Sequence, residues 1–392
     1  MTAVNITGLG VVSALGIGTK HHSNQLRSGV VGISQYQVDQ SVLYAGKVKF
    51  SNLQLAALCE VPFSPYVSRT GWLGLLAAKE ALGNLAFDFK IPAAFINGTT
   101  VGGMDLSEQY FKAISRGELG DPALFQMHDL GANTDFIASN LMRFDDVNTI
   151  STACSSAANA ILLGAQLISS GEYHRVLVGG TDALCNFTVE GFKSLMVYDS
   201  ELCQPFDINR RGLNLGEGAA YLLLESDEGI KESGNSCIAR ISGWANRNDA
   251  FHNTGTSPEG IGAQKAMNAA LEVAQILPSE ITYINAHGTG TPTNDSSELA
   301  AMETVFGKHL PDFSSTKGAT GHTLAASGAI EAVISINSLL ENCAFGTAGL
   351  SDPMTSSESL LANPKSKEMQ YVMSNSFGFG GNSTSLIFSK VQ

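Results

Sequence analysis

One cysteine, two histidines and one lysine stand at the ends of predicted strands or at the start of a predicted helix. Cys154 follows a short β-prone run and precedes about four turns of small and apolar residues, which predict a helix buried on all sides. His287 and His322 lie in glycine- and threonine-rich turns after predicted strands, and Lys317 lies in the second of these turns. A thiol can take up an acyl group, and nearby donors can stabilise the oxyanion that develops. The four residues therefore predict thioester chemistry.

Cys154 needs more than its helix to become a nucleophile. Unpaired N–H groups and the positive end of the dipole favour a negative charge on sulfur. The dipole contributes only about 0.3–1 kcal/mol, less than one pKa unit, and a free thiol is only a few per cent ionised at neutral pH. The alternative, a buried structural thiol, is the commoner role of an intracellular cysteine. The histidines and the lysine favour the catalytic interpretation.

The remaining histidines and cysteines suggest no second site. We expect the other six histidines to be structural, with His22 and His174 on the surface because their neighbours are polar. The six cysteines are scattered without a C-x-x-C pair, which argues against a zinc ribbon and a disulfide scaffold. No set of ligands in a short register predicts a metal site.

Length and composition limit the class of protein. A chain of 392 residues with 44% hydrophobic and 15% charged residues is globular, and its length favours two domains or a duplicated architecture. The net charge of −13 argues against nucleic acid or an anionic membrane as the main partner. The N-terminus has no basic and apolar leader pattern, and no long apolar run stands out. We expect a soluble, reduced, cytoplasmic protein.

Strands and helices alternate twice along the chain, which predicts two similar α/β units. The polar segment 226–236 is the candidate boundary, giving an N-terminal half, 1–230, with the nucleophile and a C-terminal half, 231–392, with the histidines and the lysine. Gly8 and Gly10 form only part of a dinucleotide-binding fingerprint. In the second half we predict strands 238–245, 281–286, 371–374 and 385–388 and helices 260–275, 294–306 and 324–340.

Four ordered motifs carry a family resemblance. They are T-A-C-S-S at 152–156, N-A-H-G-T-G-T-P-T-N-D at 285–295, K-G-A-T-G-H-T-L-A-A-S-G at 317–328 and N-S-F-G-F-G-G at 375–381. The chain resembles the β-ketoacyl-acyl carrier protein synthases of types I and II, among the thiolase-like condensing enzymes, from residue 4 to residue 388. The resemblance implies a thiolase-like fold, with two similar α/β halves in a layered α-β-α-β-α arrangement.

The resemblance also implies a role for each matching residue. Cys154 would be the acylated nucleophile, while His287 and His322 would hold the thioester carbonyl of a malonyl donor as its carboxylate leaves as CO2. Neutral imidazoles can donate N–H to the enolate oxygen, whereas a carboxylate would repel it. Lys317 would order the site and Glu331 would be the buried acid beside it. A purely structural ion pair between Lys317 and Glu331 is the alternative.

Further positions match the family's oxyanion hole, gate and binding residues. The backbone N–H groups of Cys154 and Phe379 would bind the oxyanion, and Phe379, between two glycines, would be the gate. Thr289 and Thr291 would bind the phosphopantetheine arm, and Val101 and Phe192 would line the acyl pocket.

Three segments depart from the family pattern. Residues 382–384 read Asn-Ser-Thr where many relatives have Thr-Asn-Gly, and the segment with Thr254 and Ser257 differs in length. In residues 60–72 only Arg69 is available to dock an acidic carrier protein.

The resemblance implies a homodimeric 3-oxoacyl-[acyl-carrier-protein] synthase of fatty acid elongation. It would need no resident cofactor, because its substrates arrive on the phosphopantetheine of acyl carrier protein. One alternative is a ketosynthase of a type II polyketide or aryl-polyene pathway. A non-catalytic chain-length partner is disfavoured by the complete set of Cys154, His287 and His322. A degradative thiolase would need a second cysteine near the C-terminus, and the last one here is Cys343.

Overall fold

A continuous, strongly mixed sheet forms the centre of the molecule. The computed structural model describes residues 2–38, 41–83 and 91–391. Along the sheet the strands follow the order β11-β10-β14-β15-β9-β1-β8-β7-β5-β6. The N-terminal half contributes β1 (Asn5–Ser13), β5 (Ala93–Gly98), β6 (Asp146–Ile150), β7 (Arg175–Asp182) and β8 (Gly218–Glu225). The C-terminal half contributes β9 (Ala239–Asn248), β10 (Ile281–Asn285), β11 (Asp312–Ser314), β14 (Tyr371–Gly378) and β15 (Asn382–Ser389).

The two halves share one strand topology. In the first, β1 pairs antiparallel with β8, β8 antiparallel with β7, and β7, β5 and β6 run parallel. In the second, β9 pairs antiparallel with β15, β15 antiparallel with β14, and β14, β10 and β11 run parallel. The halves meet where β1 pairs with β9. The first copy of this topology ends with β8, and the second copy begins with β9. The division into two domains at residue 230 stays a prediction.

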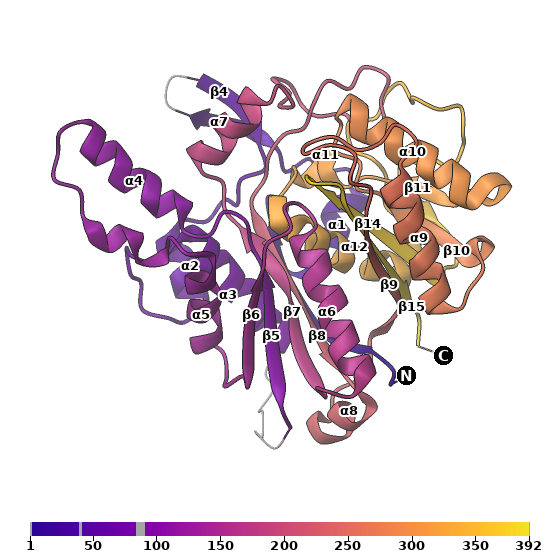
Figure 1. The fold of residues 1–392 in the computed structure, drawn as a ribbon, viewed down its shortest axis with the longest axis horizontal. Coiled ribbons are helices and arrows are strands. Elements are labelled where there is room, and N and C mark those ends of the chain that lie inside the picture. Colours follow the sequence, from indigo (N-terminus) through magenta and orange to yellow (C-terminus); the bar gives the residue numbers. More distant parts are fainter. Residues whose placement is uncertain (1, 39–40, 84–90, 392) are drawn as a thin grey trace.

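Helices cover both faces of each half, and two of them lie between the halves (Figure 1). The central pair is α6 (Ser156–Ser170) and α12 (Ser327–Glu341), which contact each other and strands of both halves. Outside them, α3 (Arg69–Leu82) packs on β1, β7 and β8, and α9 (Ile261–Ala274) packs on β9 and β15. This layered α/β arrangement is the expected thiolase-like fold.

Of the two central helices, α12 is buried on all sides from Ser327 to Leu339, whereas α6 keeps a partly exposed face with Leu162, Gln166 and Ser170, so the prediction of a helix buried on all sides after Cys154 holds only in part. Within the described chain, Leu324–Glu341 is long and apolar enough to span a membrane by length and composition, but 89% of that window is buried inside the protein. It is therefore a core helix. Small residues let α6 approach the strands closely: a Cβ on Gly164 would lie 2.3 Å from a methyl group of Val178.

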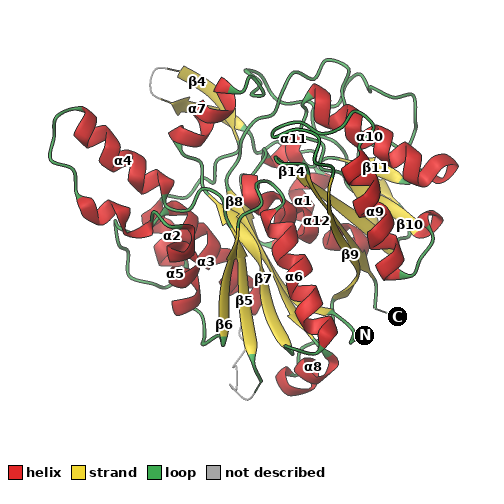
Figure 2. Ribbon diagram, viewed as in Figure 1, coloured by secondary structure: helices red, strands yellow, loops and turns green. Residues whose placement is uncertain are grey.

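The remaining elements surround this core (Figure 2). In Figure 1, α4 projects from the body of the N-terminal half. The remaining helices are α1 (Thr19–Arg27), α2 (Asn52–Leu58), α4 (Met104–Ser115), α5 (Leu130–Ser139), α7 (Asn186–Ser194), α8 (Asp227–Ser233), α10 (Pro292–Phe306) and α11 (Lys317–Thr320). Short 3-10 turns are η1 (Pro122–Met127), η2 (Pro278–Glu280), η3 (Gly307–His309) and η4 (Leu324–Ala326). Short strands are β2 (Gly16–Ile17), β3 (Ser34–Val38), β4 (Ser41–Ala45), β12 (Cys343–Ala344) and β13 (Lys365–Ser366).

Two expectations from the sequence are wrong in physically informative ways. The last two strands are longer than predicted, because the hairpin continues to the pair Gly378–Asn382 and turns through Gly380 and Gly381, both at positive φ. Their small and polar residues lack the apolar alternation that marks a strand. His22 is fully buried rather than exposed: its Nε2 lies 2.7 Å from the Ser13 hydroxyl, and its Nδ1 lies 2.9 Å from the carbonyl of Gly18.

Candidate active site

Parallel strand pairing brings the chemical residues together. Strands β10, β11 and β14 are parallel, with Asn285 opposite both Ser314 and Ser374, so the turns that follow all three leave the same edge of the sheet. His287 lies just after β10, and His322 lies after β11 and the short helix α11. The Gly378 end of β14 opens the third turn. In the other half, the parallel strand β6 leads into the cysteine turn.

The cysteine lies in a strained turn just before helix α6. Ala153 has a φ of +52°, which is uncommon for a residue with a side chain. The helix begins at Ser156 with Ser155 as its N-cap, so Cys154 precedes the helix rather than opening it. Burial raises the pKa of the Cys154 thiol to about 12, and the positive charge of Lys317 opposes this shift without overcoming it. Desolvation thus outweighs the small contribution expected from the helix dipole, and the thiol is protonated in the resting protein.

The turn that carries His287 is held by a buried acid on α10. The carboxylate of Glu298 accepts hydrogen bonds from the backbone N–H groups of His287 and Gly288, both at 2.8 Å. Burial raises the pKa of Glu298 to about 7, and these two hydrogen bonds oppose the shift. Asp295 on the same helix accepts from the N–H of Gly290 at 3.2 Å. Sequence analysis missed Glu298, because its partners become adjacent only when α10 folds back over the turn.

His322 is fixed by backbone pairing with the N-terminal half. Its N–H donates to the carbonyl of Asn214 at 2.8 Å, and its own carbonyl accepts from the N–H of Gly216 at 2.9 Å. The N–H of Leu324 donates to Nδ1 of the ring at 3.1 Å. Because Nδ1 acts as an acceptor, the proton of the neutral ring lies on Nε2.

Lys317 holds His287 in the same tautomer and forms a buried pair with Glu331. Its Nζ donates to Nδ1 of His287 at 3.2 Å and to the carbonyl of the same residue at 2.6 Å. It also forms a hydrogen-bonded ion pair with Glu331. Burial raises the pKa of Glu331 to about 7, while Lys317 opposes that shift. Lys317 thus orders the imidazole of His287, and Glu331 balances its charge.

Both rings are neutral hydrogen-bond donors. Burial lowers the pKa of His287 and of His322 well below its usual value, and the positive charge of Lys317 lowers both further. The ring centroids are 5.4 Å apart, and the planes are almost perpendicular at 88°. Two Nε2–H groups in this arrangement can stabilise one negative oxygen.

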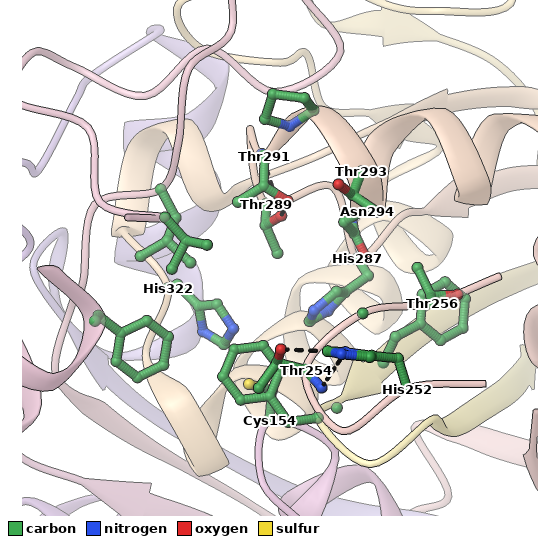
Figure 3. A pocket seen from close by; sticks show the side chains of 18 of the residues that line it. Cys154, His252, Thr254, Thr256, His287, Thr289, Thr291, Thr293, Asn294 and His322 are labelled. Atoms are coloured by element: carbon green, nitrogen blue, oxygen red, sulfur yellow. Dashed lines mark hydrogen bonds between the residues drawn. The ribbon is translucent and has the colours of Figure 1, made fainter. Parts of the chain in front are cut away.

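A cavity of about 480 Å³ contains the thiol and both rings. Figure 3 shows Cys154, His287 and His322 around one open space. Thr289 and Thr291 also line this cavity, and their hydroxyl oxygens lie 2.9 Å apart. The three segments that carry the predicted chemistry therefore share one pocket.

The predicted gate lies beside the thiol. Phe379 and Phe192 both line the cavity and stack with ring centroids 5.8 Å apart. Gly378 touches the cysteine turn: a Cβ at this position would lie 2.9 Å from the carbonyl oxygen of Thr152 and 3.3 Å from the nitrogen of Cys154. The backbone of the gate turn is thus adjacent to the backbone of the nucleophile, as an oxyanion hole shared by Cys154 and Phe379 requires.

The loop that carries Thr254 and Ser257, which differs in length from the family pattern, also contributes to the cavity. Thr254 lines it, as does His252, whose Nδ1 accepts from the N–H of Thr254 at 3.2 Å. Ser257 is not among the lining residues, because its hydroxyl instead accepts from the N–H of Ile261 at the start of α9 at 2.9 Å. His252 was not predicted, since an isolated histidine in a polar loop carries no sequence signal.

Val101 and Arg69 lie in other surroundings than the family resemblance implies. Val101 does not line this cavity: it lies in the adjacent buried cluster, against which Phe192 packs. Arg69 is not a docking residue, because its guanidinium forms two hydrogen bonds with the fully buried carboxylate of Glu217, at 2.7 and 2.8 Å. The exposed cation that lines the cavity is Arg211, which pairs with Asp199 at 3.1 Å.

Comparison with known proteins identifies the family. Residues 146–229 match the N-terminal domain of β-ketoacyl synthases, and residues 238–350 match the C-terminal domain. The chain belongs to the β-ketoacyl synthase family. It is therefore a condensing enzyme that transfers acyl groups.

Among the described residues, no group of three or more His, Cys, Asp or Glu side chains is placed to hold a metal ion.

Curated relatives and solved structures agree over the full length. The chain is 31% identical to 3-oxoacyl-[acyl-carrier-protein] synthase 2 of Staphylococcus aureus (strain COL), covering 99% of this chain and 98% of the relative. It is 30% identical to the synthase of the same name from Synechocystis sp., with the same coverage. A ketosynthase in complex with its chain length factor from Xenorhabdus doucetiae is 31% identical with a TM-score of 0.87, covering 100% of this chain and 98% of that one. The ishigamide ketosynthase/chain length factor is 27% identical with a TM-score of 0.93 and full coverage of both chains.

Proposed function

We propose that this protein is a 3-oxoacyl-[acyl-carrier-protein] synthase that elongates fatty acyl chains through an acyl-enzyme at Cys154. In the first step the sulfur of Cys154 bonds to the carbonyl carbon of an acyl thioester, and the bond from that carbon to the pantetheine sulfur breaks. The thiol proton ends on the departing pantetheine sulfur. Because the thiol is protonated at rest, this proton must move during the attack. The N–H groups of Cys154 and Phe379 stabilise the transient oxyanion.

In the second step a malonyl thioester occupies the same cavity. Its bond to the carboxylate breaks, CO2 leaves, and the electron pair forms an enolate whose oxygen accepts from Nε2–H of His287 and of His322. The enolate carbon then attacks the acyl carbon on Cys154, and the carbon–sulfur bond breaks to release the 3-oxoacyl thioester and the cysteine thiolate. The thiolate takes up one proton from solvent, which regenerates the thiol. The low pKa values keep both rings neutral. Such rings donate a hydrogen bond without readily giving up a proton to the carbanion.

The observation that carries this proposal is the shared cavity with two neutral Nε2–H donors beside one thiol. The test measures acyl loading by intact-protein mass and CO2 release from malonyl-carrier protein. Cys154→Ala should abolish loading and condensation, and normal product formation by this variant would refute the proposal. His287→Ala and His322→Ala should impair CO2 release, and unchanged release in both would exclude their role.

A type II polyketide or aryl-polyene ketosynthase is the second candidate. It is favoured by structural neighbours that are solved with chain length factors, one of them 31% identical. The two candidates differ in the primer that enters the cavity past the stacked pair Phe192–Phe379. Parallel assays with saturated and with polyenoyl or aryl primers would separate them, and preference for the unsaturated set would select the second.

We further propose a homodimer that receives its substrates from acyl carrier protein in the cytoplasm and needs no resident cofactor. Strand β6 ends the sheet and pairs only with β5 among the described strands, which leaves an edge available to a second subunit. Exposed apolar residues on helix α4 and in the loop that follows it support this: Phe111, Ile114 and Leu119. Light scattering of the purified protein tests the dimer, since a monomer at micromolar concentration would contradict it.

A further inference from the structure

A network of amide and hydroxyl side chains surrounds the turn that carries the nucleophile. It joins the cysteine turn, helix α6, strand β9 and the first residues of β15, which are distant in sequence. Its members are Thr152, Ser155, Asn159, Asn246, Asn382 and Thr384. Ser155 and Thr384 have no exposed surface, and Asn159 is 9% exposed. Thr152, Asn246 and Asn382 are partly exposed, so the network extends from the buried start of α6 to partly exposed positions.

The side-chain oxygen of Asn382 is the centre of the network. Its Oδ1 accepts from the hydroxyl of Ser155 at 2.6 Å, from Nδ2 of Asn246 at 2.7 Å and from Nδ2 of Asn159 at 3.0 Å. A carbonyl oxygen has two lone pairs, so three donors saturate it. One atom therefore ties together the start of β15, the end of β9 and the N-terminal turn of α6.

A second set of hydrogen bonds fixes two of the three donors, Asn246 and Asn159. The same Nδ2 of Asn246 lies 3.0 Å from Oδ1 of Asn159 and 2.8 Å from the hydroxyl of Thr384, so its two N–H groups are shared among three acceptors. That hydroxyl donates to Asn159 at 2.7 Å, and Asn159 donates to the hydroxyl of Thr152 at 2.9 Å. Because every member has at least two partners, the displacement of one disturbs the others.

We propose that Asn382 is a positioning residue that sets the spacing between the two backbone amides of the oxyanion hole. One amide belongs to Cys154, which adjoins Ser155, and the other belongs to Phe379, which precedes Asn382 by one short turn. Among the strands that the structure describes, no backbone ladder joins the cysteine turn to the gate turn, although Gly378 of the gate turn lies against the cysteine turn. Asn382 holds Ser155 directly and so holds the two turns in register.

Two residues at the start of β15 supply the side chains that the network needs. Both Asn382 and Thr384 use their side chains in the network. A valine at 384 would have the same shape as threonine but could make none of these hydrogen bonds.

This inference rests on the proposed acyl transfer, and the test separates its two half-reactions. Acylation of Cys154 uses the oxyanion hole, whereas CO2 release uses His287 and His322. We expect Asn382→Ala to slow single-turnover acylation by about 10–100-fold, the order expected for a misplacement of about 1 Å. CO2 release from malonyl-carrier protein should fall by less than about threefold, because neither imidazole contacts the network.

Asn246→Ala provides a second variant, and Ser242→Ala provides the matched control. Asn246→Ala removes two donors of the network, so it should slow acylation similarly, and the double variant should be no slower than the worse single one. Ser242 joins the same strands β9 and β15 through Ser389 at 2.6 Å but lies away from the site, so its loss should leave both half-reactions unchanged. Thermal unfolding of each variant reports folding separately.

The outcomes distinguish this inference from the function on which it rests. A wild-type protein without acylation would overturn the proposed function itself. An active wild type with folded Asn382→Ala and Asn246→Ala variants that acylate at the wild-type rate would overturn only the positioning role. Equal losses of acylation and CO2 release would also overturn it, because they would indicate general damage to the site.

Discussion

Replacing Lys317 by methionine is the sharpest test of how the two imidazoles are tuned. The change keeps the length of the side chain but removes both the hydrogen bond to Nδ1 of His287 and the positive charge that lowers the pKa of both rings. Without that donor, Nδ1 can carry the proton, and the ring then presents a bare Nε2 to the enolate oxygen. The variant should therefore decarboxylate slowly while it still binds substrate.

The structure allows the size of this effect to be worked out. A hydrogen bond from a charged donor contributes about 1.5–3 kcal/mol. At about 1.4 kcal/mol for each factor of ten in rate, its loss should slow CO2 release by about 10–100-fold. The remaining partner, Glu331, is 2% exposed and already has a pKa raised to about 7, so without Lys317 it becomes neutral rather than a buried charge. The variant should therefore fold. The double variant Lys317→Met with Glu331→Gln is a control, because an amide at position 331 cannot carry a charge.

The pH profile provides a second, independent readout. Because Lys317 lowers the imidazole pKa values, its removal raises them towards the ordinary range, although burial still opposes protonation. The loss of CO2 release on acidification should thus begin at a higher pH in Lys317→Met than in the wild type. Lys367→Met is the control, because Lys367 pairs with Asp312 at 3.0 Å in the same half, away from the cavity. A folded Lys317→Met variant with the wild-type rate and pH profile would refute the tuning argument.

Three further predictions follow from individual contacts. Arg69→Met should lower the free energy of unfolding by about 3–5 kcal/mol in urea titrations, because the buried carboxylate of Glu217 keeps two backbone N–H donors but loses its charge partner; an unchanged stability with weaker carrier binding would support Arg69 as a docking residue. Gly378→Ala should slow acylation, because the new Cβ would lie 2.9 Å from the carbonyl oxygen of Thr152 and push the gate turn away; wild-type acylation would show that the two turns are not closely packed. Burial lowers the pKa of His22 from 6.5 to about 4. As the pH falls from 6.5 to 4, the unfolded chain takes up a proton on this histidine before the folded protein does, so the free energy of unfolding should decrease by at most about 1.4 kcal/mol per pH unit. His22→Gln should flatten this fall, and an identical pH dependence in the variant would contradict it.

The local sequence was sufficient to find the chemical groups. Cys154 before a run of small residues, and His287 and His322 in glycine-rich turns after strands, are recognisable because turn residues and strand runs depend on neighbours in sequence. The same holds for the strand and helix order of both halves, whose core elements lie where they were predicted. Boundaries at polar residues were predicted less well, as in the hairpin that continues to Gly378 and Asn382.

Only the tertiary structure decided the environment of each group. Whether the Cys154 thiol is ionised, whether His22 is exposed and whether Arg69 can meet a partner depend on burial and on partners that are far away in sequence. The spacing of the oxyanion hole likewise depends on Asn382, which is more than 200 residues from the cysteine turn that it holds. The sequence determined which side chains are available for catalysis, because covalent chemistry is a property of residue type. The fold decided their protonation and distances, because desolvation and hydrogen bonding are set by whatever the folded chain places around them.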